Sequence, residues 1–189
     1  MGQYFYAVIY QTDSNNKKII RICINPLNCS NGMKLMEHSY FNNIVTSLIE
    51  LLLIPTSPFY KSNLVWAGDY CEDVDEEDKN LHNMCENDLI KERTNNVLKN
   101  ITKEELEIVN EYDYILNHTK KQYIDKKDHK KGEYIHPLPL LTADSNGYGM
   151  GDFKGNDEDL CGSWKGDIIS VEKEIPIDYT KFECNFVEE

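Results

Sequence analysis

The stretch from His136 to Val171 reads HPLPLLTADSNGYGMGDFKGNDEDLCGSWKGDIISV and holds six of the ten glycines of the chain. It ends in the tetrapeptide WKGD, at residues 164–167, and the only other tryptophan lies in WAGD, at residues 66–69. The rarest residue type therefore marks the same W-x-G-D pattern twice. Internal self-similarity indicates a repeated unit, so this recurrence predicts an internal duplication.

Each W-x-G-D segment is preceded by a β-hairpin signal. The run YFYAVIY, residues 4–10, leads through a polar turn into KKIIRICI, residues 17–24. The run YDYILN, residues 112–117, leads through a short link into KQYID, residues 121–125. Aromatic and β-branched runs joined by short polar links are typical of antiparallel hairpins. The sequence therefore predicts an α+β fold, in which a mainly antiparallel sheet is built from two hairpin-led pseudo-repeat halves. We place these halves at about 3–70 and 111–171 and expect the two W-x-G-D segments to occupy equivalent places.

Several segments between and within these halves have helical signals. Apolar residues recur at helical spacing from Ser39 to Ile54, where Pro55 follows, and again from Leu81 to Ile90. Thr102 and Glu105 form a capping box before a short apolar run. We therefore expect a few helices to cover the sheet, and a helical, acidic insertion at 72–110. The whole chain, 1–189, is predicted to be a single domain.

The remaining segments read as extended structure. Residues 135–141, IHPLPLL, contain two prolines, which favour an extended, buried edge segment. Residues 168–171 and 182–187 are strand-like.

Charge and composition limit the partners of the protein. Thirty-three acidic residues against twenty basic ones give a net charge of −13, which repels nucleic-acid phosphates and anionic lipid surfaces. No leader sequence and no apolar tract of membrane-spanning length is recognisable. We therefore expect a cytoplasmic protein that binds neither nucleic acid nor membranes.

The six cysteines show no C-x-x-C pair and no zinc-type spacing. In a reducing compartment they are expected to be reduced, inert packing residues.

Four motifs resemble a known family. They are MGQYF at 1–5, WAGDY at 66–70, NHTKKQY at 117–123 and IHPLPLLTADSNGYGMGDF at 135–153. Together they are similar to a family of small uncharacterised proteins from bacteria, protists and large DNA viruses. The resemblance spans nearly the whole chain and implies a shared fold, without a catalytic residue to transfer.

The glycine-rich tract is the main candidate for a binding site. Gly147, Gly149 and Gly151 form a G-x-G-x-G pattern whose backbone N–H groups could surround an anion. The pattern differs from the G-x-G-x-x-G nucleotide fingerprint, and the alternative is a loop that needs positive φ at several positions. The candidates for contact with a ligand or partner are His136, Asp144, Asn146, Gly147, Gly149, Gly151, Asp152, Trp66 and Trp164.

Three aspartates are candidates for a metal site. If the halves are related by a twofold axis, Asp69 and Asp167 could face each other and, with Asp152, bind a divalent cation such as Ca²⁺ or Mg²⁺. The alternative is that each W-x-G-D is a turn, in which Asp accepts backbone N–H bonds while Trp packs in the core. Near the glycine-rich tract, neither His136 nor His118 has a serine or cysteine at a spacing that indicates a catalytic triad.

Two functions follow from these candidates. The first is a non-enzymatic cytosolic binding or assembly module, such as a subunit of a larger complex. It would recognise a protein partner, a second copy of itself or a small ligand through the loop 142–167. The second is a small metal-dependent hydrolase that uses the clustered aspartates. We prefer the first because no nucleophile–base pair can be recognised in the sequence. We also expect the glycine tract to be an ordered loop that matters for binding more than for folding.

Overall fold

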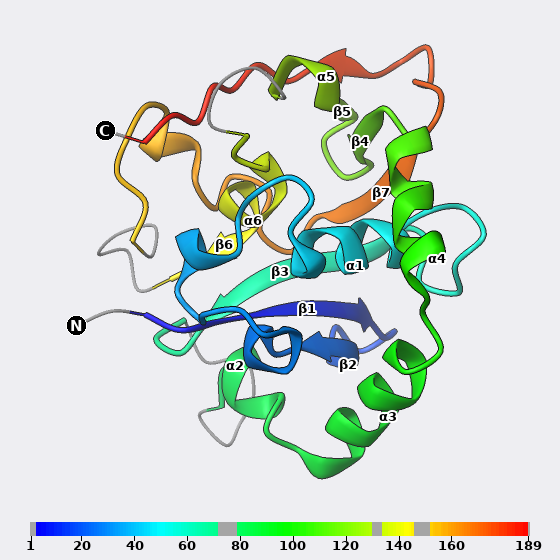
Figure 1. Cartoon of the computed structure of the whole chain (residues 1–189), viewed down its shortest axis with the longest axis vertical. Coiled ribbons are helices and arrows are strands. Elements are labelled where there is room, and N and C mark those ends of the chain that lie inside the picture. Colours follow the sequence, from blue (N-terminus) through cyan, green and yellow to red (C-terminus); the bar gives the residue numbers. More distant parts are fainter. Residues whose placement is uncertain (1–2, 72–78, 130–133, 146–151, 189) are drawn as a thin grey trace.

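The structure is a computed structural model, which describes residues 3–71, 79–129, 134–145 and 152–188. In these residues eight strands form one sheet, in the order β2-β1-β3-β7-β4-β5-β8, with β6 beside β3 (Figure 1). The strands are β1 (Phe5–Thr12), β2 (Lys18–Ile24), β3 (Ser62–Gly68), β4 (Tyr114–Asn117), β5 (Gln122–Asp125), β6 (Ala143–Asp144), β7 (Ile168–Glu172) and β8 (Thr180–Lys181). Most neighbouring pairs are antiparallel, and the β3–β6 and β5–β8 pairs are parallel. The predicted α+β class is confirmed.

Six α-helices and four 3₁₀ helices are found in the described residues. The α-helices are α1 (Ile44–Leu52), α2 (Leu81–Met84), α3 (Asp88–Leu98), α4 (Lys103–Glu107), α5 (Lys126–His129) and α6 (Pro137–Leu141). The 3₁₀ helices are η1 (Pro26–Cys29), η2 (Leu35–Glu37), η3 (Ile108–Glu111) and η4 (Glu158–Leu160). Within the described ranges, no helix has both the length and the apolar character that a membrane crossing needs.

The two predicted hairpins are β1–β2 and β4–β5. Ala7 pairs with Ile24 in the first, and Ile115 pairs with Ile124 in the second. In each half the first hairpin strand also pairs antiparallel with a third strand, β3 or β7, and these two third strands pair with each other. Counted inward from β2 or inward from β5, the order is therefore the same: second hairpin strand, first hairpin strand, third strand. A duplication would require this symmetry. Whether the halves superpose stays a prediction.

The two W-x-G-D segments do not occupy equivalent places, and this part of the prediction is wrong. Trp66 and Gly68 are strand residues of β3, where Gly68 pairs with Phe5. Residues 164–167 instead form the turn that precedes β7. The backbone of Gly166 has a φ of +74°, a left-handed conformation that a regular strand does not contain.

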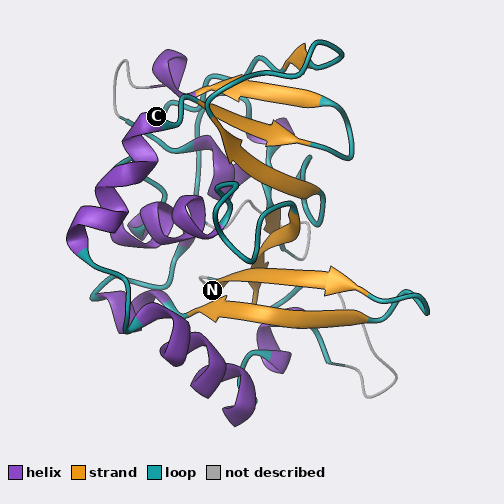
Figure 2. Cartoon of the chain, turned by 90° about the vertical axis from the view of Figure 1, so that its right-hand side faces the viewer, coloured by secondary structure: helices purple, strands orange, loops and turns teal. Residues whose placement is uncertain are grey.

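The sheet is covered on both faces. Alternate β1 residues point to opposite sides, so Phe5, Ala7 and Ile9 pack in the main core, which also contains the apolar face of α1. Tyr6, Val8 and Tyr10 pack in a smaller cluster with residues of α2. Figure 2 shows the longer helices gathered on one side of the strands.

Helix α1 begins later than its apolar pattern suggests. Asn42 has a positive φ of 64°, which a right-handed helix cannot contain. Asn43 then caps the helix, because its side chain accepts a hydrogen bond from the backbone N–H of Val45 at 2.9 Å. The helix buries Val45, Ile49 and other apolar residues.

The segment Leu81–Ile90, predicted as one amphipathic helix, is divided into α2 and the start of α3. The first helix ends at Met84, and Asn87 caps the second, since its side chain accepts from the backbone N–H of Leu89 at 3.0 Å. Leu89 is consequently 70% exposed. The Thr102–Glu105 capping box is confirmed at the start of α4.

Two extended segments were predicted wrongly. Residues 137–141 form α6, in which Pro137 occupies the first turn, where no backbone N–H is needed. His136 caps this helix, since its Nδ1 accepts from the N–H of Leu138 at 3.2 Å. Residues 182–187 lie outside the strands of the sheet.

Helix α3 lies along the outer edge of β2, on the side away from β1 (Figure 1). The backbone N–H of Cys23 donates to Thr94 Oγ1 at 3.1 Å, and Arg93 Nη1 donates to the carbonyl of Ile20 at 3.0 Å. These bonds pair backbone N–H and C=O groups of β2 that would have no partner at an open sheet edge. The predicted helical insertion thus closes one end of the sheet.

Candidate functional site

Three of the predicted contact residues lie inside the protein. Trp66 and Trp164 are both 0% exposed, and their indole N–H groups donate to His38 Nε2 at 3.0 Å and to Gln122 Oε1 at 3.1 Å. His136 is 1% exposed. The prediction that these side chains contact a partner is wrong, and the alternative that the tryptophans pack in the core is confirmed.

His136 belongs to a buried ionic cluster with Glu50 and Lys126. Its Nε2 lies 3.0 Å from Glu50 Oε1, and Lys126 Nζ lies 3.1 Å from both carboxylate oxygens. Burial alone would raise the pKa of Glu50, but the His136 hydrogen bond and the Lys126 charge outweigh it, so that this pKa is below its ordinary value. The cluster connects α1 to α5 and to the start of α6.

The predicted metal aspartates have separate partners. Asp69 Oδ1 accepts from the backbone N–H of Tyr4 at 3.2 Å, and Asp152 Oδ1 accepts from that of Met36 at 2.9 Å. Asp167 Oδ2 accepts from Asn117 Nδ2 at 2.7 Å. In the part of the chain that the structure describes, no three or more His, Cys, Asp or Glu side chains are grouped to hold a metal ion.

The structure describes only part of the glycine-rich tract. Asn146, Gly147, Gly149 and Gly151 lie outside the described residues. Asp144 is described, and its Oδ1 forms an ion pair with Lys165 Nζ at 2.9 Å.

Cys23 and Cys85 form a disulfide, so the prediction of six free thiols is wrong. The residues are separated by 62 positions in the sequence, but the fold brings their Cα atoms within 6.0 Å, a separation that suits a disulfide. Among the four free cysteines, burial raises the pKa of Cys71 to about 11 and that of Cys161 and Cys184 to about 12. These thiols stay protonated near neutral pH and are poor nucleophiles.

The structure brings together one serine–histidine pair that the sequence did not reveal. His118 Nε2 lies 2.7 Å from Ser170 Oγ, and Ser170 in turn donates to Glu172 Oε1 at 2.8 Å. Tyr179 OH lies 2.6 Å from His118 Nδ1, and Tyr60 OH donates to the same Glu172 oxygen at 2.6 Å. The hydroxyl hydrogen of Ser170 is committed to Glu172, so His118 donates to Ser170 and does not act as its base.

Burial supports a structural role for this network. Ser170 is 0% exposed, so a substrate cannot reach its oxygen. Burial, assisted by the charge of Lys61, lowers the pKa of His118 to about 4. The imidazole is therefore neutral near pH 7, as its hydrogen bonds require. The network joins β4, β7 and the segment before β8.

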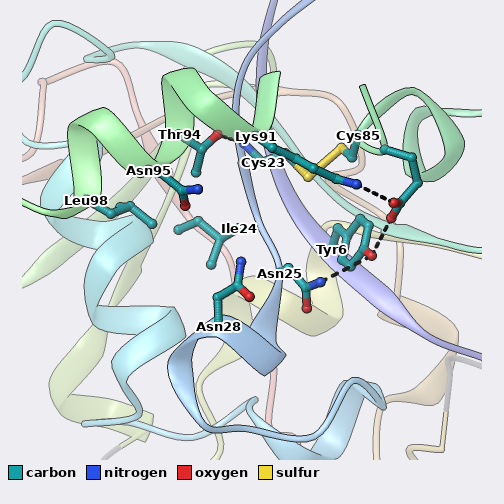
Figure 3. Close-up of a pocket in the computed structure, with 11 residues that line it drawn as sticks. Tyr6, Cys23, Ile24, Asn25, Asn28, Cys85, Lys91, Thr94, Asn95 and Leu98 are labelled. Atoms are coloured by element: carbon teal, nitrogen blue, oxygen red, sulfur yellow. Dashed lines mark hydrogen bonds and ion pairs between the residues drawn. A yellow bond between two sulfur atoms is a disulfide. The ribbon is translucent and has the colours of Figure 1, made fainter. Parts of the chain in front are cut away.

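A groove of about 270 Å³ lies between β2, η1 and α3 (Figure 3). The Cys23–Cys85 disulfide forms part of its wall. The half-buried side chain of Leu98 supplies an apolar surface within it, while Ile24 also lines the groove but is only 1% exposed. The groove therefore depends on the contact between α3 and the outer edge of the sheet.

One end of the groove is closed by a chain of hydrogen bonds. Lys91 Nζ donates to Glu86 Oε2 at 2.6 Å, and Tyr6 OH donates to Glu86 Oε1 at 2.6 Å. Asn25 Nδ2 donates to the Tyr6 oxygen at 3.3 Å. The hydrogen bonds from Lys91 and Tyr6 lower the pKa of Glu86, while burial and the Glu86 hydrogen bond raise the pKa of Tyr6. The charges at this end thus pair with each other.

The other end carries two side-chain amides that have no hydrogen-bond partner in the described part of the chain. Asn28, on η1, and Asn95, on α3, flank Ile24 in Figure 3. Neither side-chain amide forms a hydrogen bond with another residue in the described ranges. We call this end, with Ile24 and Leu98, the Asn28–Asn95 groove. Sequence reasoning missed both residues, because an asparagine in a polar loop or on a polar helix face has no distinguishing local pattern.

His82 packs against Tyr6, one of the residues that line the groove. Its ring stacks on that of Tyr6, with centroids 4.1 Å apart and planes 7° apart. Both ring nitrogens are buried, and neither has a hydrogen-bond partner among the residues described. Burial lowers the pKa of His82, so the imidazole is neutral near pH 7 and acts as a packing surface for Tyr6.

Comparisons with protein-family models, with curated proteins and with solved structures gave no match. The family resemblance of the sequence motifs therefore stays a prediction, and a functional inference depends on the geometry of the site.

Proposed function

We propose that the protein is a non-enzymatic binding or assembly module that contacts its partner through the Asn28–Asn95 groove. The observation that carries this proposal is the pair of side-chain amides of Asn28 and Asn95, which have no hydrogen-bond partner among the described residues and share a groove with the half-buried Leu98. Binding sites commonly combine apolar lining with a small number of convergent polar groups. A partner that pairs with the two amides would gain hydrogen bonds without breaking any within the protein.

The acid–base chemistry of the described residues favours binding over catalysis. Ser170 is buried and already donates its hydrogen to Glu172. Glu50 and His136 satisfy each other inside the core. A nucleophile needs a free base within reach and access to the substrate, and neither pair offers both.

The loop 142–167 stays a second proposed contact surface, for a protein partner or for a second copy of the chain. Its described part contains two glycines, Gly162 and Gly166, with a φ of +74° each. The proposed role of residues 146–151 in recognition depends on a tract outside the described residues. The alternative function, a metal-dependent hydrolase, would need Asp69, Asp152 and Asp167 to converge, and their separate partners weigh against it.

Affinity capture from the cells that naturally make the protein tests the proposal. The Asn28→Ala/Asn95→Ala double variant should lose the captured partner, while Asn96→Ala should retain it. Asn96 lies on the same helix but outside the groove, and its side chain accepts from Lys99 Nζ at 2.9 Å. All three proteins should have the same melting temperature, because the changed side chains are exposed. Capture of the same proteins by the wild type and the double variant would contradict the proposal.

A further inference from the structure

We infer that the ligand of the Asn28–Asn95 groove is a short extended peptide segment without acidic side chains, an inference that rests on the proposed function. A primary amide offers two N–H donors and one carbonyl acceptor. A peptide group offers one donor and one acceptor. Each of the two asparagines can therefore satisfy one peptide group of a bound segment.

The space between the amides suits a side chain of such a segment. The half-buried Leu98 supplies the apolar surface beside the amides, while Ile24, which lies between Asn28 and Asn95 in Figure 3, is only 1% exposed. In an extended peptide alternate side chains point to the same side, so one apolar or β-branched side chain can rest on this surface. A groove of about 270 Å³ is just below the usual range for small-molecule pockets, which fits one or two residues of peptide.

Recognition here uses side chains and does not require the segment to join the sheet. Strand addition requires free backbone groups at the edge of a sheet. Along β2 the N–H of Cys23 and the carbonyl of Ile20 are already paired with Thr94 and Arg93. The asparagine amides therefore supply the hydrogen-bond donors and acceptors that backbone groups of an open edge would supply in strand addition.

The charges of the site exclude acidic ligands. Lys91 pairs with Glu86 at 2.6 Å, so the groove offers no unpaired cation to a carboxylate or phosphate. The net charge of −13 adds a long-range repulsion for anions and an attraction for basic segments.

The aromatic content of the groove favours a peptide over a sugar. A sugar ring that carries an acetamido group would present the same amide, but sugar faces bind on exposed aromatic rings. Tyr6 is the aromatic residue of the lining, it is 6% exposed, and one face of its ring is covered by His82.

Nuclear magnetic resonance titration of the full ¹⁵N-labelled chain tests the inference. The probe is the blocked peptide acetyl-Lys-Thr-Lys-Thr-Lys-N-methylamide, and its matched control replaces each lysine by glutamate. N-acetylglucosamine and inorganic phosphate are titrated separately. We expect the lysine peptide to shift the side-chain amide signals of Asn28 and Asn95 in a saturable way. The Asn28→Ala/Asn95→Ala variant should bind it at least about tenfold more weakly, since two pairs of modest hydrogen bonds are lost.

Each other outcome overturns the inference. Unchanged affinity in the double variant would show that charge alone attracts the peptide. Binding of N-acetylglucosamine or phosphate in the groove, without the peptide, would replace the peptide by another ligand and leave the proposed function intact. If no probe shifts the groove signals and affinity capture is unaffected by the double variant, both the inference and the proposed function fail.

Discussion

Loss of the Cys23–Cys85 disulfide is expected to lower the free energy of unfolding by about 4 kcal/mol. The two cysteines are 62 positions apart in the sequence, and closure of a loop of that length removes conformational entropy from the unfolded chain. The bond also holds the end of α2 to β2, so its loss weakens the wall of the groove. For a chain of this size, a change of about 4 kcal/mol corresponds to a melting temperature lower by roughly 8–16 °C.

Thermal unfolding of three proteins measures this effect. The Cys23→Ser/Cys85→Ser variant should melt at the temperature of the reduced wild type, and added reductant should leave its melting unchanged. The control, Cys29→Ser/Cys161→Ser, removes two free, half-buried thiols and should respond to reductant as the wild type does.

Thiol titration of the unfolded, unreduced protein supplies an independent check. The structure predicts four free thiols before reduction and six afterwards. Disulfides persist mainly in oxidising compartments, so this result also bears on the predicted cytoplasmic location. Six free thiols in protein from its natural source, or a melting temperature that does not respond to reductant, would refute the reasoning.

Three further predictions concern contacts within the fold. Glu50→Gln should cost about 3–5 kcal/mol in urea unfolding, because Lys126 would stay buried without its counter-ion. The pKa of Glu50 is lower in the folded than in the unfolded chain. Its contribution to the free energy of unfolding is therefore present above about pH 4.3 and is lost as the pH falls through the folded pKa. A free energy of unfolding that does not change over this acid range would contradict the ionic cluster. Gly166→Ala should cost more than about 1 kcal/mol in thermal unfolding, since φ is +74° and a Cβ would lie 2.7 Å from Tyr10 OH; an unchanged melting temperature would disprove the strain. Ser170→Ala should lower the free energy of unfolding by about 1–3 kcal/mol, measured by urea unfolding, because it removes buried hydrogen bonds. A variant as stable as the wild type would contradict a structural role for Ser170.

Local patterns were sufficient to predict the hairpins and the first long helix. In β1 the alternation of Phe5, Ala7 and Ile9 with Tyr6 and Val8 is a direct consequence of strand geometry. Such patterns depend only on neighbours in the sequence, so one chain is enough to read them.

Other features depend on contacts between distant residues. The proline-rich segment before Thr142 was predicted to be extended, but Pro137 lies in the first turn of a helix, where proline is well tolerated. The matching tryptophan motifs suggested equivalent places, yet Gly166 adopts a backbone conformation that Gly68 does not share. A four-residue pattern does not determine the backbone conformation of its glycine.

The candidate site could not be predicted for the same reason. Cys23 and Cys85 meet because α3 packs beside β2 while α2 packs against β1 and β3. Asn28 and Asn95 flank one groove only after η1 and α3 have been positioned by that packing. In the sequence these four residues are spread over more than seventy positions.

Site-specific photo-cross-linking tests the central claim most directly. p-Benzoylphenylalanine is introduced in place of Leu98, which lines the groove, or in place of Leu89, which is 70% exposed on the same helix and outside the groove. If the groove is the contact surface, irradiation in the cells that naturally make the protein yields a cross-linked adduct from position 98, and the adduct disappears when Asn28 and Asn95 are changed to alanine. An adduct from position 89 alone, or one that persists in the double variant, would contradict a binding module that acts through the Asn28–Asn95 groove.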